Sequence, residues 1–93
     1  MKTICLDYDG TFTEFPELMN MIIDYGAKNN IRVILATMRY PEERDSELEK
    51  LEKRIDVYYT SRRAKIGYLF IEHGIQPTIY IDDRPEWLYK DSI

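Results

Sequence analysis

Two aspartates near the start of the chain have the type and spacing of residues that do chemistry. Asp7 directly follows the apolar run 4–6, and Asp9 lies two positions further on, just before Gly10. Side chains two positions apart in extended backbone point the same way, so both carboxylates are expected to leave the strand end side by side. Carboxylates held together are unfavourable unless a cation or a proton compensates their charge. The pair therefore predicts a catalytic or metal-binding site.

Polar residues follow two later apolar runs in the same manner. Thr37 ends one run, with Arg39 two positions later, and the adjacent acids Asp82 and Asp83 end the last one. Adjacent acids after a buried strand favour a bound cation, and their oxygens are the ligands that Mg²⁺ prefers. Arg39 either reaches a phosphate oxygen as a forked donor or faces solvent, and the sequence leaves both interpretations open.

The elements that must position these residues alternate along the chain. Apolar runs predict strands at residues 3–6, 31–36, 55–59 and 78–81, and helical spacing predicts helices at 16–29, 41–54 and 62–73. Strands that alternate with helices predict parallel pairing and right-handed crossovers. The expected fold is an α/β, three-layer, Rossmann-like sheet of about four parallel strands with helices on both faces. Ligands of such sheets bind beyond the carboxyl ends of the strands.

Helical spacing also predicts which faces of the helices are buried. In the first helix Leu18, Ile22 and Tyr25 share a face, with Met19 and Ile23 beside them, and in the third Ala64, Tyr68 and Ile71 form one stripe. Ser61 is expected to cap the start of the third helix, and Gly74 to end it.

The segment DYDGTFT, residues 7–13, resembles the first motif of the haloacid dehalogenase-like hydrolases, which is Asp-x-Asp-Gly-Thr after an apolar strand. The family's three further motifs are matched in order by Thr37, by Lys65 near a helix start and by the acidic pair Asp82-Asp83. The resemblance spans residues 3–84. Members often carry a cap domain after the first motif or between the second and third. Residues 12–30 and 40–54 have room for little more than a helix each, so the resemblance implies one catalytic core over residues 1–93 without a cap.

The resemblance implies a magnesium-dependent phosphohydrolase that acts on a phosphomonoester through an aspartyl-phosphate. Asp7 would be the nucleophile, Asp9 the general acid and base, and Lys65 the neutralising cation, a role for which Arg62 and Arg63 compete in the sequence. The residues implied to bind substrate are Thr37, Arg39, Gly10 and Thr11. Those implied to hold Mg²⁺ are Asp7, the backbone carbonyl of Asp9, and Asp83, with Asp82 acting directly or through water.

Three alternatives remain open at this point. The chain could be a regulatory domain that binds Mg²⁺ and phosphate without turnover. The segment IDDRPEWL, residues 81–88, is similar to the phosphatase half of phage polynucleotide kinase-phosphatases, which implies a nucleic-acid 3′-phosphate end as an alternative to a small phosphorylated molecule. The small core also allows a subunit that depends on a partner, such as a homo-oligomer.

The bulk composition excludes several classes of protein. The chain has 93 residues, of which 44% are hydrophobic and 32% charged, and a net charge of −4, which is typical of a globular domain. Removing Asp7, Asp9, Asp82 and Asp83 from the 17 acidic residues leaves 13, equal to the 13 Lys and Arg, which argues against a broad basic face for nucleic acid. No apolar run has membrane-spanning length and no signal peptide is evident. With its single cysteine, Cys5, the chain is predicted to be cytoplasmic.

Overall fold

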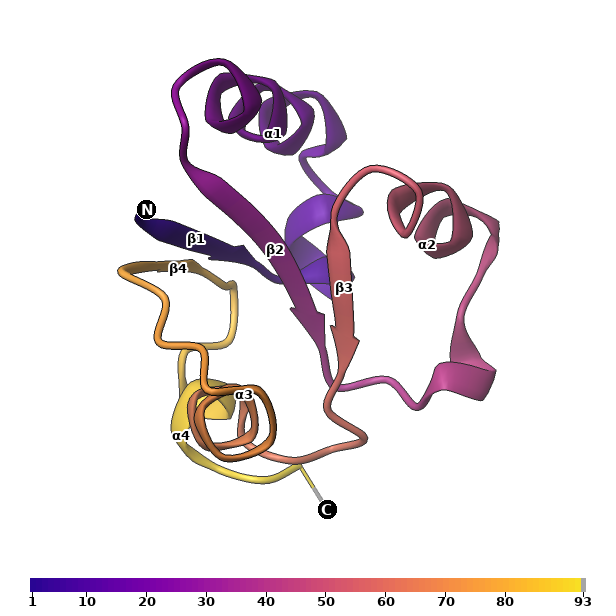
Figure 1. Ribbon diagram of the computed structural model, residues 1–93. Helices are drawn as coiled ribbons and strands as arrows, with labels where there is room; N and C mark the ends of the chain where they lie inside the picture. Colours follow the sequence, from indigo (N-terminus) through magenta and orange to yellow (C-terminus); the bar gives the residue numbers. More distant parts are fainter. Residues whose placement is uncertain (93) are drawn as a thin grey trace.

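One sheet of four parallel strands forms the centre of the fold in the computed structural model, which describes residues 1–92 (Figure 1). The strands are β1 (Thr3–Leu6), β2 (Arg32–Thr37), β3 (Asp56–Tyr59) and β4 (Ile79–Ile81). Their order is β3-β2-β1-β4, with every pair parallel. The chain therefore moves outward from β1 to β3 and then returns to the other side of β1. This reversal creates a crevice at the carboxyl ends of β1 and β4, the usual place for a ligand in such sheets.

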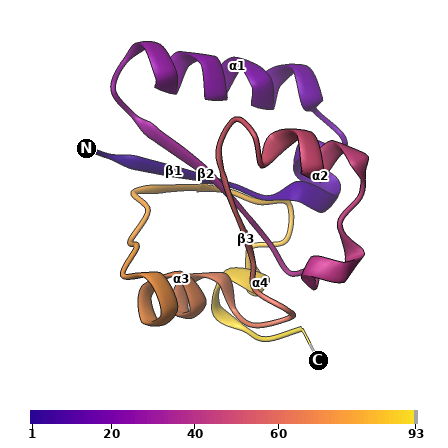
Figure 2. The same ribbon diagram turned by 45° about the vertical axis from the view of Figure 1, so that its right-hand side comes forward.

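Helices cover both faces of the sheet (Figure 2). The helices α1 (Pro16–Lys28) and α2 (Ser46–Leu51) lie on one face, and α3 (Lys65–His73) and α4 (Glu86–Tyr89) lie on the other. Two short turns, η1 (Tyr8–Phe12) and η2 (Pro41–Glu43), follow β1 and β2. The predicted α/β architecture with a parallel sheet and helices on both faces is thus confirmed.

The central strands are apolar on both faces because each face packs on helices. Val33 and Leu35 of β2 belong to the core under α1 and α2, whereas Ile34 and Ala36 pack with Leu69 of α3. Successive strand residues point to opposite faces, so a strand covered on both sides needs a continuous apolar run.

The rotation of α1 differs from the prediction. The helix buries Met19, Ile23 and Gly26, whereas Leu18 and Tyr25 are 50% and 59% exposed. A Cβ on Gly26 would lie 2.5 Å from the Cγ2 atom of Val33 and 2.8 Å from the backbone oxygen of Ile31, which leads into β2. The helix therefore packs closely on the start of β2 at Gly26, on its buried face and not on the one that exposes Leu18 and Tyr25.

The predicted second helix is divided in two. Arg44 is extended, with φ −67° and ψ 143°, so the turn η2 cannot continue into α2. Asp45 then begins α2 as a capping residue, because its carboxylate accepts a hydrogen bond of 2.9 Å from the backbone N–H of Leu48. Leu48 and Leu51 are buried as predicted.

The third helix begins at Lys65, three residues later than predicted. Ser61 and Arg62 have φ values of 55° and 71°, which places them in the left-handed region and prevents a helix there. Ser61 is therefore not the cap. The N–H of Ala64 instead donates a 2.7 Å hydrogen bond to the carboxylate of Asp91, from the chain's last segment. Gly74 ends the helix in the left-handed conformation, as predicted.

The buried face of α3 was predicted only in part, since Tyr68 packs against the core but Ile71 does not, and α4 was missed. Leu69 and Lys65 are the buried side chains of α3, while Ile71 is exposed. Helix α4 has only four residues, too few to give a periodic pattern. The segment between η1 and β2 forms only α1, and the segment between β2 and β3 forms only η2 and α2. Neither segment builds a cap domain, as the sequence predicted. None of the helices built from residues 1–92 combines the length and apolar character needed to cross a membrane.

Candidate active site

The predicted polar residues meet at the carboxyl edge of the sheet. Asp7 directly follows β1, and its backbone N–H extends the pairing with β4 through a 2.9 Å hydrogen bond to Ile81. Asp82 and Asp83 follow β4, and Thr37 ends β2. The two acidic segments therefore lie at the crevice between β1 and β4.

A buried lysine joins the two acidic segments. The Nζ atom of Lys65 lies 2.6 Å from Asp7 Oδ1 and 2.6 Å from Asp82 Oδ2, and the lysine side chain is only 1% exposed. Removing an ammonium group from water is unfavourable unless charged partners surround it, and here both partners are carboxylates. The lysine at the start of α3 thus ties this helix to β1 and β4.

The neighbouring arginines do not enter the carboxylate cluster. Arg62 donates to the backbone oxygen of Met38 at 2.7 Å and pairs with Glu43, while Arg63 pairs with Glu72. Of the three basic residues that compete in the sequence, Lys65 is the one that contacts Asp7.

The turn after β1 has a specific requirement for Gly10. Its φ is +84°, and a Cβ there would overlap Oδ2 of Asp83, so a side chain would displace this carboxylate. The next residue, Thr11, donates from its hydroxyl to Asp7 Oδ2 at 3.0 Å and accepts from the N–H of Asp83 at 3.2 Å. Gly10 and Thr11 were predicted to bind substrate. In the structure they position the carboxylates of Asp7 and Asp83.

The donor set fits a hard divalent cation. One carboxylate oxygen from each of Asp7, Asp82 and Asp83 lies within 4.8 Å of the others. Three carboxylates and one ammonium leave a formal charge of −2, which a divalent cation balances. Asp82 already accepts hydrogen bonds from Lys65 and from the N–H of Arg84. Asp7 likewise accepts two, from Lys65 and Thr11, so hydrogen bonding alone does not decide between Asp7 and Asp82 as a direct metal ligand beside Asp83.

Burial shifts the acidity of the Asp7–Lys65 pair. Desolvation raises the pKa of Asp7 to about 7, and the nearby ammonium of Lys65 opposes this shift only in part. Burial also tends to lower the pKa of Lys65, but contact with Asp7 and Asp82 outweighs it, and the net pKa is raised. The contacts therefore favour the charged form of Lys65, whereas burial disfavours the ionised form of Asp7 in the metal-free chain.

We expect magnesium to stabilise the protein more strongly at alkaline than at acidic pH. The folded chain raises the pKa of Asp7 to about 7, whereas an aspartate in an unfolded chain has a pKa of about 4. Without metal, the contribution of Asp7 to stability is therefore fully present below about pH 4 and is lost as pH rises to about 7. Mg²⁺ requires the ionised carboxylate and opposes this loss. Melting temperatures at about pH 5.5 and about pH 8, with and without Mg²⁺, measure the effect.

Asp83→Asn should abolish most of this magnesium response, because it removes one charged ligand. Glu49→Gln, an exposed acid of α2 remote from the cluster, is the matched control and should respond like the parent chain. An undiminished melting shift in Asp83→Asn would place the cation elsewhere.

Asp9 faces a different environment from Asp7, contrary to the predicted side-by-side arrangement. The Nε and NH2 groups of Arg39 donate to its two oxygens at 3.0 and 2.8 Å, while Asp9 remains exposed. The alternation rule fails because residues 8–12 form the turn η1 rather than a continued strand. Arg39 also donates its backbone N–H to the hydroxyl of Thr37 at 3.2 Å. Arg39 thus connects the end of β2 with Asp9 in the turn after β1.

Two residues that hold Arg39 were not recognised in the sequence. The guanidinium lies 5.1 Å from the ring centroid of buried Tyr8, and its NH1 is 3.6 Å from Asp45 Oδ2. Tyr8 in turn donates its hydroxyl to Asp45 at 2.8 Å. Asp45 stands before Ser-Glu-Leu, an arrangement typical of a helix start, and no local pattern indicates its contact with Arg39.

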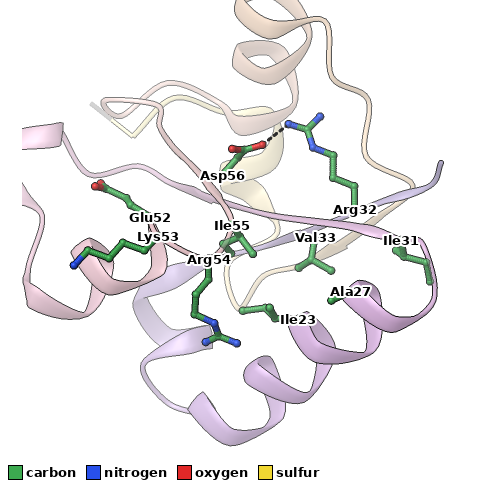
Figure 3. A pocket seen from close by; sticks show the side chains of 10 residues that line it. All are labelled: Ile23, Ala27, Ile31, Arg32, Val33, Glu52, Lys53, Arg54, Ile55 and Asp56. Atoms are coloured by element: carbon green, nitrogen blue, oxygen red, sulfur yellow. Dashed lines mark hydrogen bonds and ion pairs between the residues drawn. The ribbon is translucent and has the colours of Figure 1, made fainter.

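Two cavities lie at opposite ends of the sheet. One of about 520 Å³ borders Asp9 and Arg39 at the carboxyl end. Another of about 400 Å³ lies where β2 and β3 begin, beside α1, and its rim carries an ion pair between Arg32 and Asp56 (Figure 3). The first cavity is the one next to the candidate catalytic residues.

Comparison of the chain with protein-family models, with curated proteins and with solved structures gives no significant match. The functional assignment therefore depends on the residues and their geometry.

Proposed function

We propose that this protein is a magnesium-dependent phosphohydrolase that cleaves phosphomonoesters through an aspartyl-phosphate, on a haloacid dehalogenase-like core without a cap. The observation that carries the proposal is the buried bridge from Lys65 to Asp7 and Asp82, next to Asp83. A bridge with a purely structural role needs charge balance, whereas this cluster keeps a surplus of negative charge at the usual ligand crevice. The surplus suits a cation and a phosphoryl group that bind together.

Asp7 is the proposed nucleophile. Its Oδ1 is bonded to Lys65 and its Oδ2 to Thr11, so the carboxylate is fixed in orientation before substrate arrives. An oxygen of Asp7 forms a bond to phosphorus while the bond from phosphorus to the leaving oxygen breaks. The ammonium of Lys65 offsets the negative charge on the transferring group. A magnesium ion held by Asp7, Asp83 and the backbone carbonyl of Asp9 would neutralise the phosphoryl oxygens.

Asp9 is the proposed general acid and base. It gives a proton to the departing oxygen and later removes one from the water that hydrolyses the aspartyl-phosphate. Its hydrogen bonds with Arg39 are exposed, so phosphoryl oxygens entering the site compete with Asp9 for the same guanidinium. Arg39 would thus bind substrate by leaving Asp9, which frees the acid.

A regulatory domain that binds phosphate without turnover is the second candidate. The observation in its favour is the two-point contact between Arg39 and Asp9, which occupies the acid in the substrate-free chain. The two candidate functions differ in whether the protein hydrolyses a phosphomonoester, so an assay of hydrolysis distinguishes them.

Release of phosphate from 4-nitrophenyl phosphate and from an alkyl phosphate, with Mg²⁺ or with a chelator, tests the proposal. We expect magnesium-dependent hydrolysis of both esters. Asp9→Asn should slow the alkyl ester by about a hundredfold or more and the nitrophenyl ester less, because nitrophenolate leaves without a proton. Glu14→Gln, an exposed acid of the neighbouring loop, is the control. Folded, magnesium-binding protein that hydrolyses neither ester would favour the regulatory domain.

A further inference from the structure

The cavity beside Asp9 has the position of a leaving-group pocket. It has a volume of about 520 Å³, within the usual range for small-ligand sites, and it lies on the Asp9 side of the nucleophile. Its lining comprises Asp9, Met38, Arg39, Glu43, Arg62, Trp87 and Ser92. Because the general acid must touch the departing oxygen, whatever that oxygen carries extends into this cavity.

The charges in the cavity wall are already balanced. Arg39 pairs with Asp9 at 2.8 Å, and Arg62 pairs with Glu43 at 3.0 Å. Beyond the cavity, the remaining arginines of residues 1–92 are also within ion-pair distance of a carboxylate: Arg32, Arg44, Arg54, Arg63 and Arg84. A groove for a nucleic-acid backbone requires cations that are available to phosphates. The lining of the cavity contains two cations, Arg39, which is proposed to turn to the phosphoryl group, and Arg62, which is paired with Glu43. This lining has no row of cations for further phosphates, so the cavity favours an uncharged leaving group.

The remaining walls are suited to a flat ring. Trp87 of α4 is half-buried, and the guanidinium of the exposed Arg84 lies over one face of its indole, 4.6 Å from the ring centroid. Met38 is buried, lines the same cavity as Ser92 and supplies a polarisable thioether. Indole faces stack well on other planar rings, so the face of Trp87 opposite Arg84 suits a planar group.

The cavity is also held open by specific backbone contacts. Arg62 has a φ of 71°, its N–H and guanidinium both donate to the backbone oxygen of Met38, and its own oxygen accepts from the N–H of Ser92 at 2.7 Å. These hydrogen bonds join Met38, Arg62 and Ser92, three residues of the cavity wall. A pocket whose walls are fixed in this way binds a rigid group without reorganisation.

We propose that the substrate is a small phosphomonoester whose leaving group carries an uncharged planar aromatic ring, as in a nucleoside monophosphate, and that this ring stacks on Trp87. The proposal rests on the phosphohydrolase function and adds its substrate class. It assigns Trp87 as a specificity-determining residue that has no part in the phosphoryl transfer itself.

A pair of substrates that differ only in the aromatic ring measures how much this ring contributes to kcat/KM. A nucleoside 5′-monophosphate and ribose 5-phosphate share the sugar and the leaving oxygen, and differ in the base. We expect kcat/KM with Mg²⁺ to be about tenfold or more higher for the nucleotide, the scale of one stacked base. Trp87→Leu should remove this preference and leave ribose 5-phosphate within about twofold of the parent chain. Tyr89→Leu, a 74% exposed aromatic of the same helix, should keep it. Equal kcat/KM for the two esters in the parent chain would overturn the proposal.

A binding measurement keeps the test independent of turnover. Trp87 is the chain's one tryptophan, so intrinsic fluorescence reports on it directly. In Asp7→Asn, a nucleoside monophosphate should quench this fluorescence and ribose 5-phosphate should not. Quenching without hydrolysis of any ester by the parent chain would support the stacking site and refute the phosphohydrolase function. Absence of quenching by the nucleotide would overturn the stacking site even if generic esters are hydrolysed. A 3′-phosphorylated oligonucleotide preferred over the 3′-mononucleotide by more than about tenfold would also contradict a small substrate.

Discussion

Asp7→Asn should lower magnesium-dependent phosphate release by roughly four orders of magnitude or more, the scale found when a hydrolase loses its nucleophile. The amide is nearly the same size as the carboxylate. Its single oxygen can accept from Lys65, and its NH2 group can donate to the hydroxyl of Thr11, a contact in which the direction of donation is reversed. What the amide lacks is the negative charge that attacks phosphorus. Initial rates on an aryl phosphate measure the loss.

The stability of the same variant separates chemistry from folding. Burial raises the pKa of Asp7 because its charge is unfavourable in the metal-free chain. A neutral amide should therefore leave the metal-free melting temperature at about pH 8 unchanged or higher, while the magnesium response falls. Asp24→Asn changes the same atoms at an exposed site on α1 and should keep full activity. Full activity in well-folded Asp7→Asn would exclude an aspartyl-phosphate at this residue.

The strands and the edge that carries the site were predictable from sequence, because both depend on local patterns. Apolar runs such as residues 3–6 end at the polar residues themselves, so one pattern indicates both the strand and the site edge. Parallel pairing then places the residues after β1 and β4 together, although 75 positions separate Asp7 from Asp82. Topology thus predicted that Asp7 and Asp82 converge, whereas Lys65 was indicated only by the family resemblance, with Arg62 and Arg63 as alternatives.

The remaining errors come from contacts between distant segments. The rotation of α1 brings Gly26 close to Val33, a contact that helical periodicity does not encode. The start of α3 depends on left-handed residues at 61 and 62 and on the hydrogen bond from the N–H of Ala64 to Asp91. The direction of Asp9 depends on the turn after β1 and on Arg39, which reaches it from the end of β2. Each requires knowledge of which side chains meet across the fold.

Lys65→Met should have the largest effect on stability. It leaves Asp7 and Asp82 buried without their shared cation, and loss of one partner of a buried ion pair costs about 3–5 kcal/mol of unfolding free energy. For a chain of this size we expect the melting temperature at about pH 8 to fall by roughly 10 °C or more. Methionine fills similar volume, so lost packing contributes little. Thermal unfolding of the metal-free protein measures the change, and Lys50→Met at an exposed site of α2 is the matched control.

Two further measurements on Lys65→Met distinguish its electrostatic role from a packing role. The destabilisation should shrink at about pH 5.5, since Asp7, whose pKa is already raised, then takes up a proton and the repulsion with Asp82 falls. Adding Asp82→Asn to Lys65→Met should recover part of the stability, because one of the unpaired charges is gone, but should not recover activity. Hydrolysis needs the ammonium near the transferring group, which no neighbouring arginine supplies since Arg62 and Arg63 are paired elsewhere. A destabilisation that is independent of pH and unchanged by Asp82→Asn would mean that Lys65 acts by filling space, and the proposed catalytic cluster would lose its central residue.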